Sequence, residues 1–102
     1  MYNIFINEPF FEWDERKNAS NQRKHGVSFA EARSVFMDAN AGQAFDPDHS
    51  EEEDRFMLVG VSDRLRVLAV FYCYRREYSM IRIISARKTT EAEEKDYWRV
   101  IR

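Results

Sequence analysis

The strongest constraint on the fold is a run of three strand-like segments in the second half of the chain. Arg55–Val61, Arg66–Tyr74 and Tyr78–Ala86 are rich in β-branched and aromatic residues. Only four and three residues connect them, and connections this short join antiparallel neighbours. The sequence therefore predicts an antiparallel β-meander. The first two segments are apolar at both parities, so we expect them to be central strands covered on both faces.

Capping signals predict three helices around this sheet. Asp14 is a suitable N-cap and Gly26 a suitable left-handed C-terminal residue for a helix over residues 15–24. The sequence Ser28–Glu31 is a capping box that opens a second helix, and Thr90–Glu93 is another that opens a C-terminal helix. The predicted class is therefore α+β, with two N-terminal helices and one C-terminal helix packed with the sheet.

Apolar spacing indicates which helix surfaces face the core. In the second helix the apolar residues recur at helical spacing, at Phe29, Ala32, Val35 and Phe36. In the C-terminal helix we expect the inner side to carry Tyr97, Trp98 and Ile101. Residues 1–12, with Pro9 among them, suit an extended segment or a short edge strand better than a helix. A short strand is predicted over Gln43–Phe45, followed by an acidic loop with six carboxylates between residues 46 and 54.

The chain has the size of one domain. Its 102 residues contain no internal repeat and no linker, so residues 1–102 are expected to form a single unit. The longest apolar run, Val67–Tyr74, has eight residues, far fewer than the roughly 20 that span a bilayer. The single cysteine, Cys73, forms no intrachain disulfide or cysteine zinc cluster and is expected to act as a small hydrophobe. We therefore expect a cytoplasmic protein without a membrane segment.

Charge is segregated along the chain. Residues 1–63 carry a net charge of −7, whereas residues 64–90 carry +6, although the whole chain has only −2. A basic half of this kind faces either a polyanion or an acidic partner, unless the two halves neutralise one another in the fold.

Arg82 lies within the apolar segment Met80–Ala86, where an arginine needs a partner. Two interpretations are open, an internal salt bridge to Glu31 or Glu93, or a phosphate. In a regular strand, parity places Arg82 on one face and Ser85 on the other. Arg87 and Lys88 are expected beyond the end of the strand, where they serve a partner or the C-terminal helix.

The chemistry-bearing residues are cations, two histidines and aromatics. The chain has no glycine-rich phosphate loop, no nucleophile elbow and no histidine pair at metal spacing, so neither a metal nor a cofactor is expected. This set suits RNA cleavage without a metal. A base takes the 2′-hydroxyl proton, cations stabilise the pentacovalent phosphate, and an acid protonates the leaving oxygen.

Five ordered strings resemble the BrnT family of bacterial toxins. They are Phe11-Glu12-Trp13-Asp14, Lys24-His25-Gly26-Val27-Ser28-Phe29, Asp48-His49-Ser50, Arg55, and Arg82-Ile83-Ile84-Ser85-Ala86-Arg87. The resemblance implies a RelE-like fold and metal-independent endoribonuclease activity that halts translation. It also implies neutralisation by a BrnA-type ribbon-helix-helix antitoxin, through which alone the toxin reaches operator DNA.

Eight positions match the polar residues characteristic of that family. They are Trp13, Lys24, His25, His49, Arg55, Arg66, Arg82 and Arg87. From chemistry we assign proton transfer to Lys24 and His25 and phosphate stabilisation to Arg66 and Arg82. The other four are assigned to substrate binding.

Two departures from the family and two further interpretations accompany this resemblance. About ten residues precede Phe11, and Leu65 stands in a hairpin where the family commonly has glycine, so the turn beside Arg66 is open to question. The chain is alternatively a non-catalytic binding partner or co-repressor that keeps the toxin fold. A third interpretation is a degenerate toxin that has lost its activity.

Overall fold

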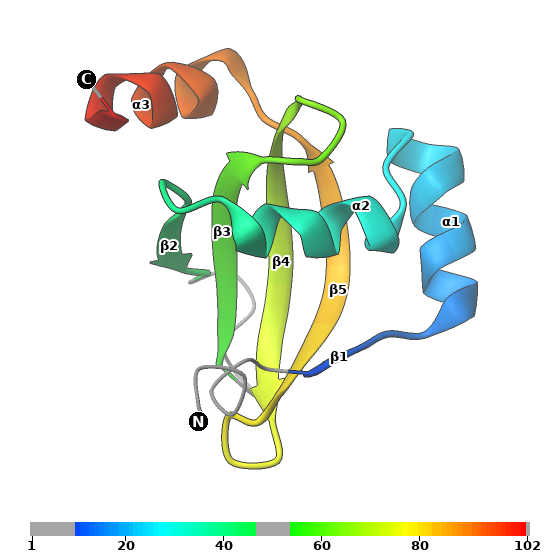
Figure 1. Ribbon diagram of the computed structural model, residues 1–102. Helices are drawn as coiled ribbons and strands as arrows, with labels where there is room; N and C mark the ends of the chain where they lie inside the picture. Colours follow the sequence, from blue (N-terminus) through cyan, green and yellow to red (C-terminus); the bar gives the residue numbers. More distant parts are fainter. Residues whose placement is uncertain (1–9, 47–53, 102) are drawn as a thin grey trace.

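The computed structural model describes residues 10–46 and 54–101 and has a mixed α+β architecture (Figure 1). The elements, in chain order, are β1 (Phe10–Glu12), α1 (Glu15–His25), α2 (Phe29–Ser34), the 3₁₀ helix η2 (Val35–Met37), β2 (Gly42–Phe45), β3 (Arg55–Val61), β4 (Val67–Arg75), β5 (Met80–Lys88) and α3 (Glu91–Ile101). None of the helices in these residues is long and apolar enough to cross a membrane.

The strands form one sheet in the order β1-β5-β4-β3-β2. β3, β4 and β5 make the predicted antiparallel meander, with the second and third strands one or two residues later than expected. The predicted short strand is present as β2, which pairs antiparallel with β3 at one edge. For residues 10–12 the expected edge strand is confirmed as β1, which pairs in parallel with the first residues of β5, and residues 1–9 of that prediction lie outside the described residues.

The two hairpin turns use left-handed backbone at residues other than glycine. Leu65 has φ 60°, so it adopts the left-handed conformation for which glycine is preferred. The β3–β4 turn therefore forms with leucine in place of the glycine that is common in the family. In the β4–β5 turn Arg76, Glu77 and Tyr78 have φ of 50°, 54° and 73°. Left-handed backbone costs an L-residue about 1–2 kcal/mol, so both turns depend on the strands that they join.

The predicted caps of α1 and α3 are confirmed. Asp14 accepts the backbone N–H of Arg16 at 2.8 Å, and Gly26 ends α1 in the left-handed region at φ 70°. In α3 the box between Thr90 and Glu93 is reciprocal, with distances of 3.0 and 3.1 Å.

The capping box of α2 is only half formed. The hydroxyl of Ser28 accepts the backbone N–H of Glu31 at 3.0 Å. The Glu31 carboxylate accepts from Ser62 and Arg66 instead of returning to Ser28. The predicted second half of this box is therefore wrong, because an arginine and a hydroxyl are better placed to bind this buried carboxylate.

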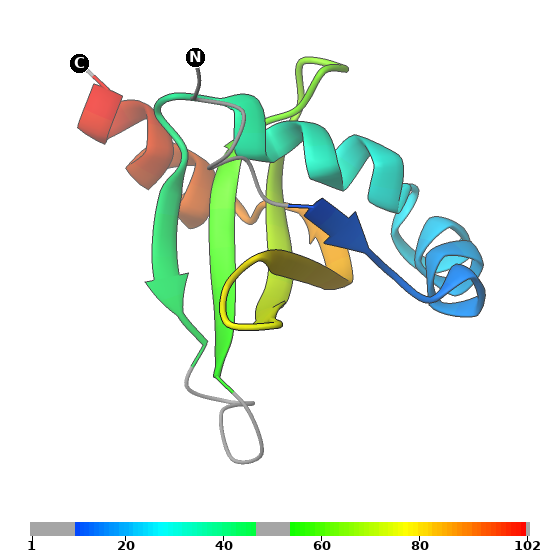
Figure 2. The same cartoon turned by 60° about the horizontal axis from the view of Figure 1, so that its bottom comes forward.

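One face of the sheet, here called the helix face, packs against α1, α2 and η2. Figure 1 shows α2 crossing in front of the strands and α1 beside β5, and Figure 2 shows α2 on one side of the sheet. The sheet residues of this face are Leu58, Leu68, Val70, Tyr72, Ile81, Ile83 and Ala86. Phe29, Ala32 and Val35 are fully buried against them, and Phe36 packs edge-on to Tyr72. The predicted apolar face of the second helix is thus confirmed.

The opposite face, here called the open face, is defined by Arg55, Phe71, Cys73, Arg82 and Arg87. Within residues 10–46 and 54–101 the expected cover on both faces of the central strands is seen mainly on the helix face, although Ala69 and Cys73 of the open face are also buried. Among the described residues, α3 approaches this face at the β2–β3 corner. Tyr97 is buried there as predicted, but Trp98 is 46% exposed, so its predicted inward position is wrong. The side chain of Ile101 lies outside the described residues.

A bulge in β5 changes which side chains share a face. Phe71 pairs with Ser85, but Tyr72 pairs with Ile83, so Ile84 is an extra residue. Beyond the bulge Ser85 and Arg87 lie on the same face as Arg82. The parity prediction that placed Ser85 opposite Arg82 is wrong because it assumed a regular strand. The prediction that Arg87 and Lys88 follow the strand is also wrong, because β5 extends through Lys88.

Candidate functional site

The open face carries its polar residues in a regular arrangement. Cross-strand pairing puts Arg55, Cys73 and Arg82 in one row over β3, β4 and β5. The next row contains Phe71 and Ser85. Because neighbouring strands are about 4.8 Å apart, the Cα atoms of Arg55 and Arg82 are separated by roughly 10 Å. Two arginine side chains at that spacing can reach one anion between them.

A groove of about 580 Å³ lies on this face. Its lining residues are His25, Phe45, Asp46, Arg55, Met57, Phe71, Ser85, Ala86, Arg87 and Glu93. Three residues predicted for the site, His25, Arg55 and Arg87, therefore line one concave surface although they come from α1, β3 and β5.

Arg55 is the least satisfied cation of the groove. Its Nε is shielded from solvent and has no hydrogen-bond partner within the described part of the chain. Leaving a buried donor unsatisfied costs about 1–3 kcal/mol, and more for a charged group. An anion in the groove would satisfy this donor.

Arg87 is held in place from two sides. Its guanidinium donates two bonds to the carboxylate of Glu93, at 2.8 and 3.0 Å, and lies 5.3 Å from the centre of the Phe71 ring. The hydrogen bonds from Arg87 lower the pKa of Glu93 and outweigh the opposite effect of burial. A bidentate pair over an aromatic ring fixes the plane of the guanidinium, while about a third of the side chain is exposed.

Arg82 forms a single salt bridge to a residue that the sequence analysis did not consider. Its Nε donates to Glu12 of β1 at 2.9 Å, and its side chain is 37% exposed. The proposed internal partners, Glu31 and Glu93, bind Arg66 and Arg87 instead. Arg82 therefore forms a salt bridge within the chain, as one of the two interpretations predicted, but with Glu12 and not with the partners named there. The partner was missed because the parallel pairing of β1 and β5 was not predicted.

His25 reaches the groove because α1 is attached to the edge of β5. The side chain of Asn21, 6% exposed, donates to the carbonyl oxygens of Val27 and Ala86 and accepts the N–H of Ala86. At Ala86 these hydrogen bonds satisfy the backbone groups of β5 that a neighbouring strand would otherwise pair with. His25 follows one turn later on the same side of the helix.

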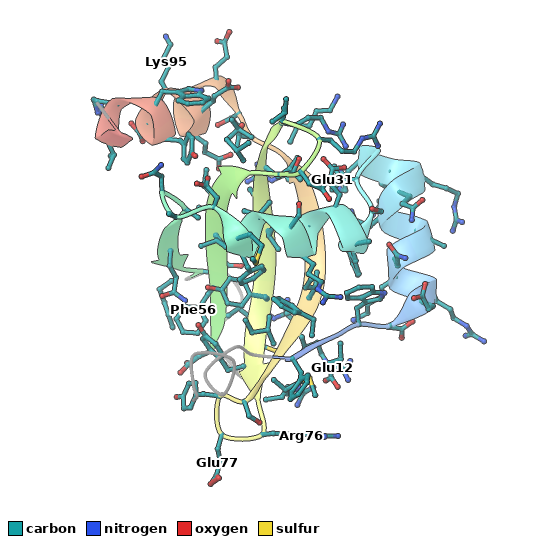
Figure 3. All side chains as sticks on the ribbon, in the orientation of Figure 1. Glu12, Glu31, Phe56, Arg76, Glu77 and Lys95 are labelled. Carbon is teal, nitrogen blue, oxygen red and sulfur yellow. The ribbon has the colours of Figure 1, made fainter. Side chains whose placement is uncertain are left out.

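Arg66 lies on the other side of the sheet from Arg82. Its Nε donates to the carboxylate of Glu31 at 3.0 Å, and its Nη2 donates to the carbonyl oxygen of Gly26, also at 3.0 Å. Glu31 is only 3% exposed at its side chain and stands beside the β3–β4 turn, far from Glu12 in Figure 3. The structure thus does not bring Arg66 together with the arginines of the open face, and its predicted phosphate role receives no geometric support.

The remaining predicted residues have separate positions. Trp13 packs edge-on against Phe29 and donates its indole N–H to Glu15, which is a structural environment. Lys24 is exposed in the last turn of α1 next to His25 and is not among the groove residues. His49 lies outside the described residues. The binding or catalytic roles of these three residues stay predictions.

Sequence reasoning missed Glu12 and Asn21 as neighbours of the site. Asn21 carried one usable signal, its four-residue spacing from His25. Glu93 was predicted as a capping residue, a role that it performs, and as a possible partner of Arg82, but it binds Arg87 instead. Within the described residues no group of three or more His, Cys, Asp and Glu side chains is arranged to hold a metal ion. The arrangement that is present, cations around a groove with a histidine at its rim, suits an anionic substrate.

Comparison with known proteins identifies the family. The model of a family described as ribonuclease toxin BrnT of type II toxin-antitoxin systems matches residues 13–93. No curated protein matches the chain. Among solved structures, the 1.1 Å crystal structure of the Brucella abortus ribonuclease toxin BrnT superimposes with a TM-score of 0.60. The match covers 82% of this chain and 100% of that one at 23% identity, and thus shows a shared fold. The chain therefore belongs to the BrnT family of ribonuclease toxins of type II toxin-antitoxin systems.

Proposed function

We propose that the chain is an endoribonuclease toxin whose RNA-cleaving site is the groove on the open face. The observation that carries this proposal is the buried, unsatisfied Nε of Arg55 in a groove that also holds His25 and Arg87. A phosphodiester supplies the acceptor oxygens that this donor lacks. The family description, a ribonuclease toxin, agrees with that substrate.

In the proposed reaction the 2′-oxygen attacks the adjacent phosphorus. A base removes the 2′-hydroxyl proton, the new O2′–P bond forms, the P–O5′ bond breaks, and the departing 5′-oxygen receives a proton. Arg55 of the groove and Arg82, which is outside the groove lining but in the same cross-strand row, stabilise the charge on the pentacovalent phosphate, and Arg87 holds the neighbouring phosphate. His25 transfers a proton at the rim of the groove, and Lys24, beside it, is the candidate for the second transfer.

The finer properties expected from the family belong to the same proposal. The fold is RelE-like, cleavage needs no metal, and the activity halts translation in the cytoplasm. A BrnA-type ribbon-helix-helix antitoxin neutralises the toxin and alone carries the complex to operator DNA. The support is membership of a type II toxin-antitoxin family, because such a family implies an antitoxin partner.

The test is cleavage of a labelled oligoribonucleotide in the presence of a chelator. Wild-type protein is expected to cut it, and Arg55→Ala to lower the rate at least 100-fold, which corresponds to about 2.7 kcal/mol of transition-state stabilisation. The unfolding free energy of Arg55→Ala should not fall, because the substitution removes an unsatisfied buried donor. Arg16→Ala, which removes an exposed arginine at the other end of α1, is the matched control and should cleave normally.

Two outcomes would contradict the proposal. Undiminished cleavage by Arg55→Ala would show that the groove is not the site. Absence of cleavage by the wild-type protein, with normal growth on expression and intact antitoxin binding, would favour the non-catalytic co-repressor.

A further inference from the structure

The two edges of the sheet are unlike each other. At the β5 edge, β1 pairs with residues 80–82, and Asn21 of α1 binds the backbone of Ala86. At the other edge, all four residues of β2 are exposed. An exposed strand edge presents unpaired backbone groups to which another strand can be added.

The hydrogen-bond pattern shows which groups of β2 face outward. Asp46 donates its N–H to the carbonyl of Arg55 at 2.8 Å, and this bond fixes the alternation along the β2–β3 pair. The backbone groups of Gly42 and Ala44 therefore face β3. Those of Gln43 and Phe45 face away from the sheet, where the described residues provide no strand.

An apolar groove of about 420 Å³ runs beside this edge, between β2, β3 and α3. Its lining residues are Asn40, Gly42, Gln43, Ala44, Met57, Val59, Glu93, Asp96, Tyr97 and Val100. Val100 is 79% exposed, and Phe45, on the other side of β2, is 50% exposed. A strand added to β2 would thus meet apolar surface on both of its faces.

We propose that the antitoxin adds a strand to the β2 edge and fills this groove with large apolar side chains at alternate positions. The inference rests on the proposed function in assuming an antitoxin partner. Of the acidic residues beside the groove, Glu93 is paired with Arg87 and Asp96 with Arg99, whereas Glu91 and Glu94 of α3 are exposed and leave this end of the groove acidic. The added strand is therefore flanked by lysine or arginine, which complements that charge.

A second copy of this chain fits the edge less well. Symmetric pairing of β2 with β2 would bring only Gly42 and Ala44 of the second copy to the groove side, because Gln43 and Phe45 point to the helix face. Glycine and alanine side chains leave a groove of this volume unfilled. A strand of different sequence is needed to fill it.

Gly42 offers a sharp test. A Cβ at this residue would meet nothing within 4 Å, so a side chain there enters the groove without disturbing the chain itself. Gly42→Trp should lower the affinity for the antitoxin encoded beside the gene at least tenfold, and Gly42→Ala should change it less than twofold. Calorimetric titration at fixed salt measures both. Cleavage of RNA by Gly42→Trp alone should equal that of the wild type.

Backbone amide exchange tests the added strand itself. Binding of the antitoxin should slow exchange at the amides of Gln43 and Phe45 at least tenfold, whereas those of Gly42 and Ala44 are already paired with β3. Unchanged exchange at Gln43 and Phe45, or unchanged affinity of Gly42→Trp, would overturn the proposal. A wild-type protein that is dimeric, with a dimer that Gly42→Trp dissociates, would also overturn it, because the β2 edge would then bind a second copy of this chain. A wild-type chain that cleaves RNA but does not bind the neighbouring gene product would overturn this proposal and leave the ribonuclease assignment standing.

Discussion

Arginines on the two sides of the sheet have contrasting environments. On the helix side, Arg66 donates to the carboxylate of Glu31 and to the carbonyl of Gly26, and Glu31 is almost wholly buried. On the open face, Arg82 has one bond to Glu12, whose side chain is 29% exposed, and the Nε of Arg55 has no partner in the described residues. An arginine whose hydrogen-bond donors are satisfied by acceptors of the protein thus stabilises the fold. An arginine with unsatisfied donors is available to bind a ligand.

The strongest way to test this contrast is to remove Arg66. Arg66→Met leaves the buried Glu31 carboxylate without its cation, and breaking a buried pair costs about 3–5 kcal/mol. Denaturant unfolding should show a loss at the lower end of this range, because Arg66 is 27% exposed at its side chain. The double variant Glu31→Leu/Arg66→Met should recover part of it.

The rate of RNA cleavage per folded molecule should change less than threefold in Arg66→Met. A tenfold loss of cleavage rate in molecules shown to be folded would instead place Arg66 in the site, as predicted from the sequence.

Asn21 attaches α1, which carries His25, to the edge of β5. Its replacement should have the next largest effect on stability. Asn21→Leu leaves backbone groups of Ala86 and Val27 unsatisfied, which we expect to cost about 2 kcal/mol. Because α1 then loses its attachment to β5, kcat should fall about tenfold with KM nearly unchanged. Gln22→Ala, an exposed neighbour on the same helix, should alter stability by less than about 0.5 kcal/mol. Equal kcat in Asn21→Leu and wild type would show that His25 does not depend on this anchor.

The sequence predicted the meander, the caps and the helix face well because these depend on local signals. Asp14, Gly26 and the Thr90–Glu93 box act within one turn of helix, and apolar spacing alone identifies the face of α2. Two local predictions failed, the second half of the Ser28–Glu31 box and the inward position of Trp98, and the other failures are non-local. The bulge at Ile84 depends on how β5 meets β4 and α1, and it reverses the parity from which the face of Ser85 was derived.

The partners of the arginines were equally beyond local reasoning. Glu12 and Arg82 are 70 residues apart, and Glu31 and Arg66 are 35 apart. The first pair is set by the parallel pairing of β1 with β5, and the second by the packing of α2 against the β3–β4 turn. The sequence gives no signal of which carboxylate meets which cation. Of the candidate residues, the structure brings His25, Arg55 and Arg87 together in one groove, whereas the assignment of Arg66 to phosphate binding finds no geometric support.

Acid should reduce the contribution of the Glu31–Arg66 pair to the free energy of unfolding. Burial raises the pKa of Glu31, but hydrogen bonds from Arg66 and Ser62 outweigh it and hold the pKa below the ordinary 4.5. A lowered pKa in the folded state gives stability that is present above about 4.5 and is lost as the pH falls through the folded value. Unfolding free energies measured between pH 6 and 3 should therefore fall less steeply in Glu31→Leu/Arg66→Met than in wild type. Parallel curves would show that this pair does not contribute to acid sensitivity.

The most direct measurement of the contrast follows the arginine Nε–H signals of the ¹⁵N-labelled wild-type protein by NMR. A 2′-O-methyl oligoribonucleotide serves as the ligand, because it carries phosphates but has no 2′-hydroxyl to attack. The signals of Arg55 and Arg82 should shift on titration, and that of Arg66, which is bonded to Glu31, should not. A shift of the Arg66 signal with Arg55 unmoved would contradict the division between the two sides of the sheet.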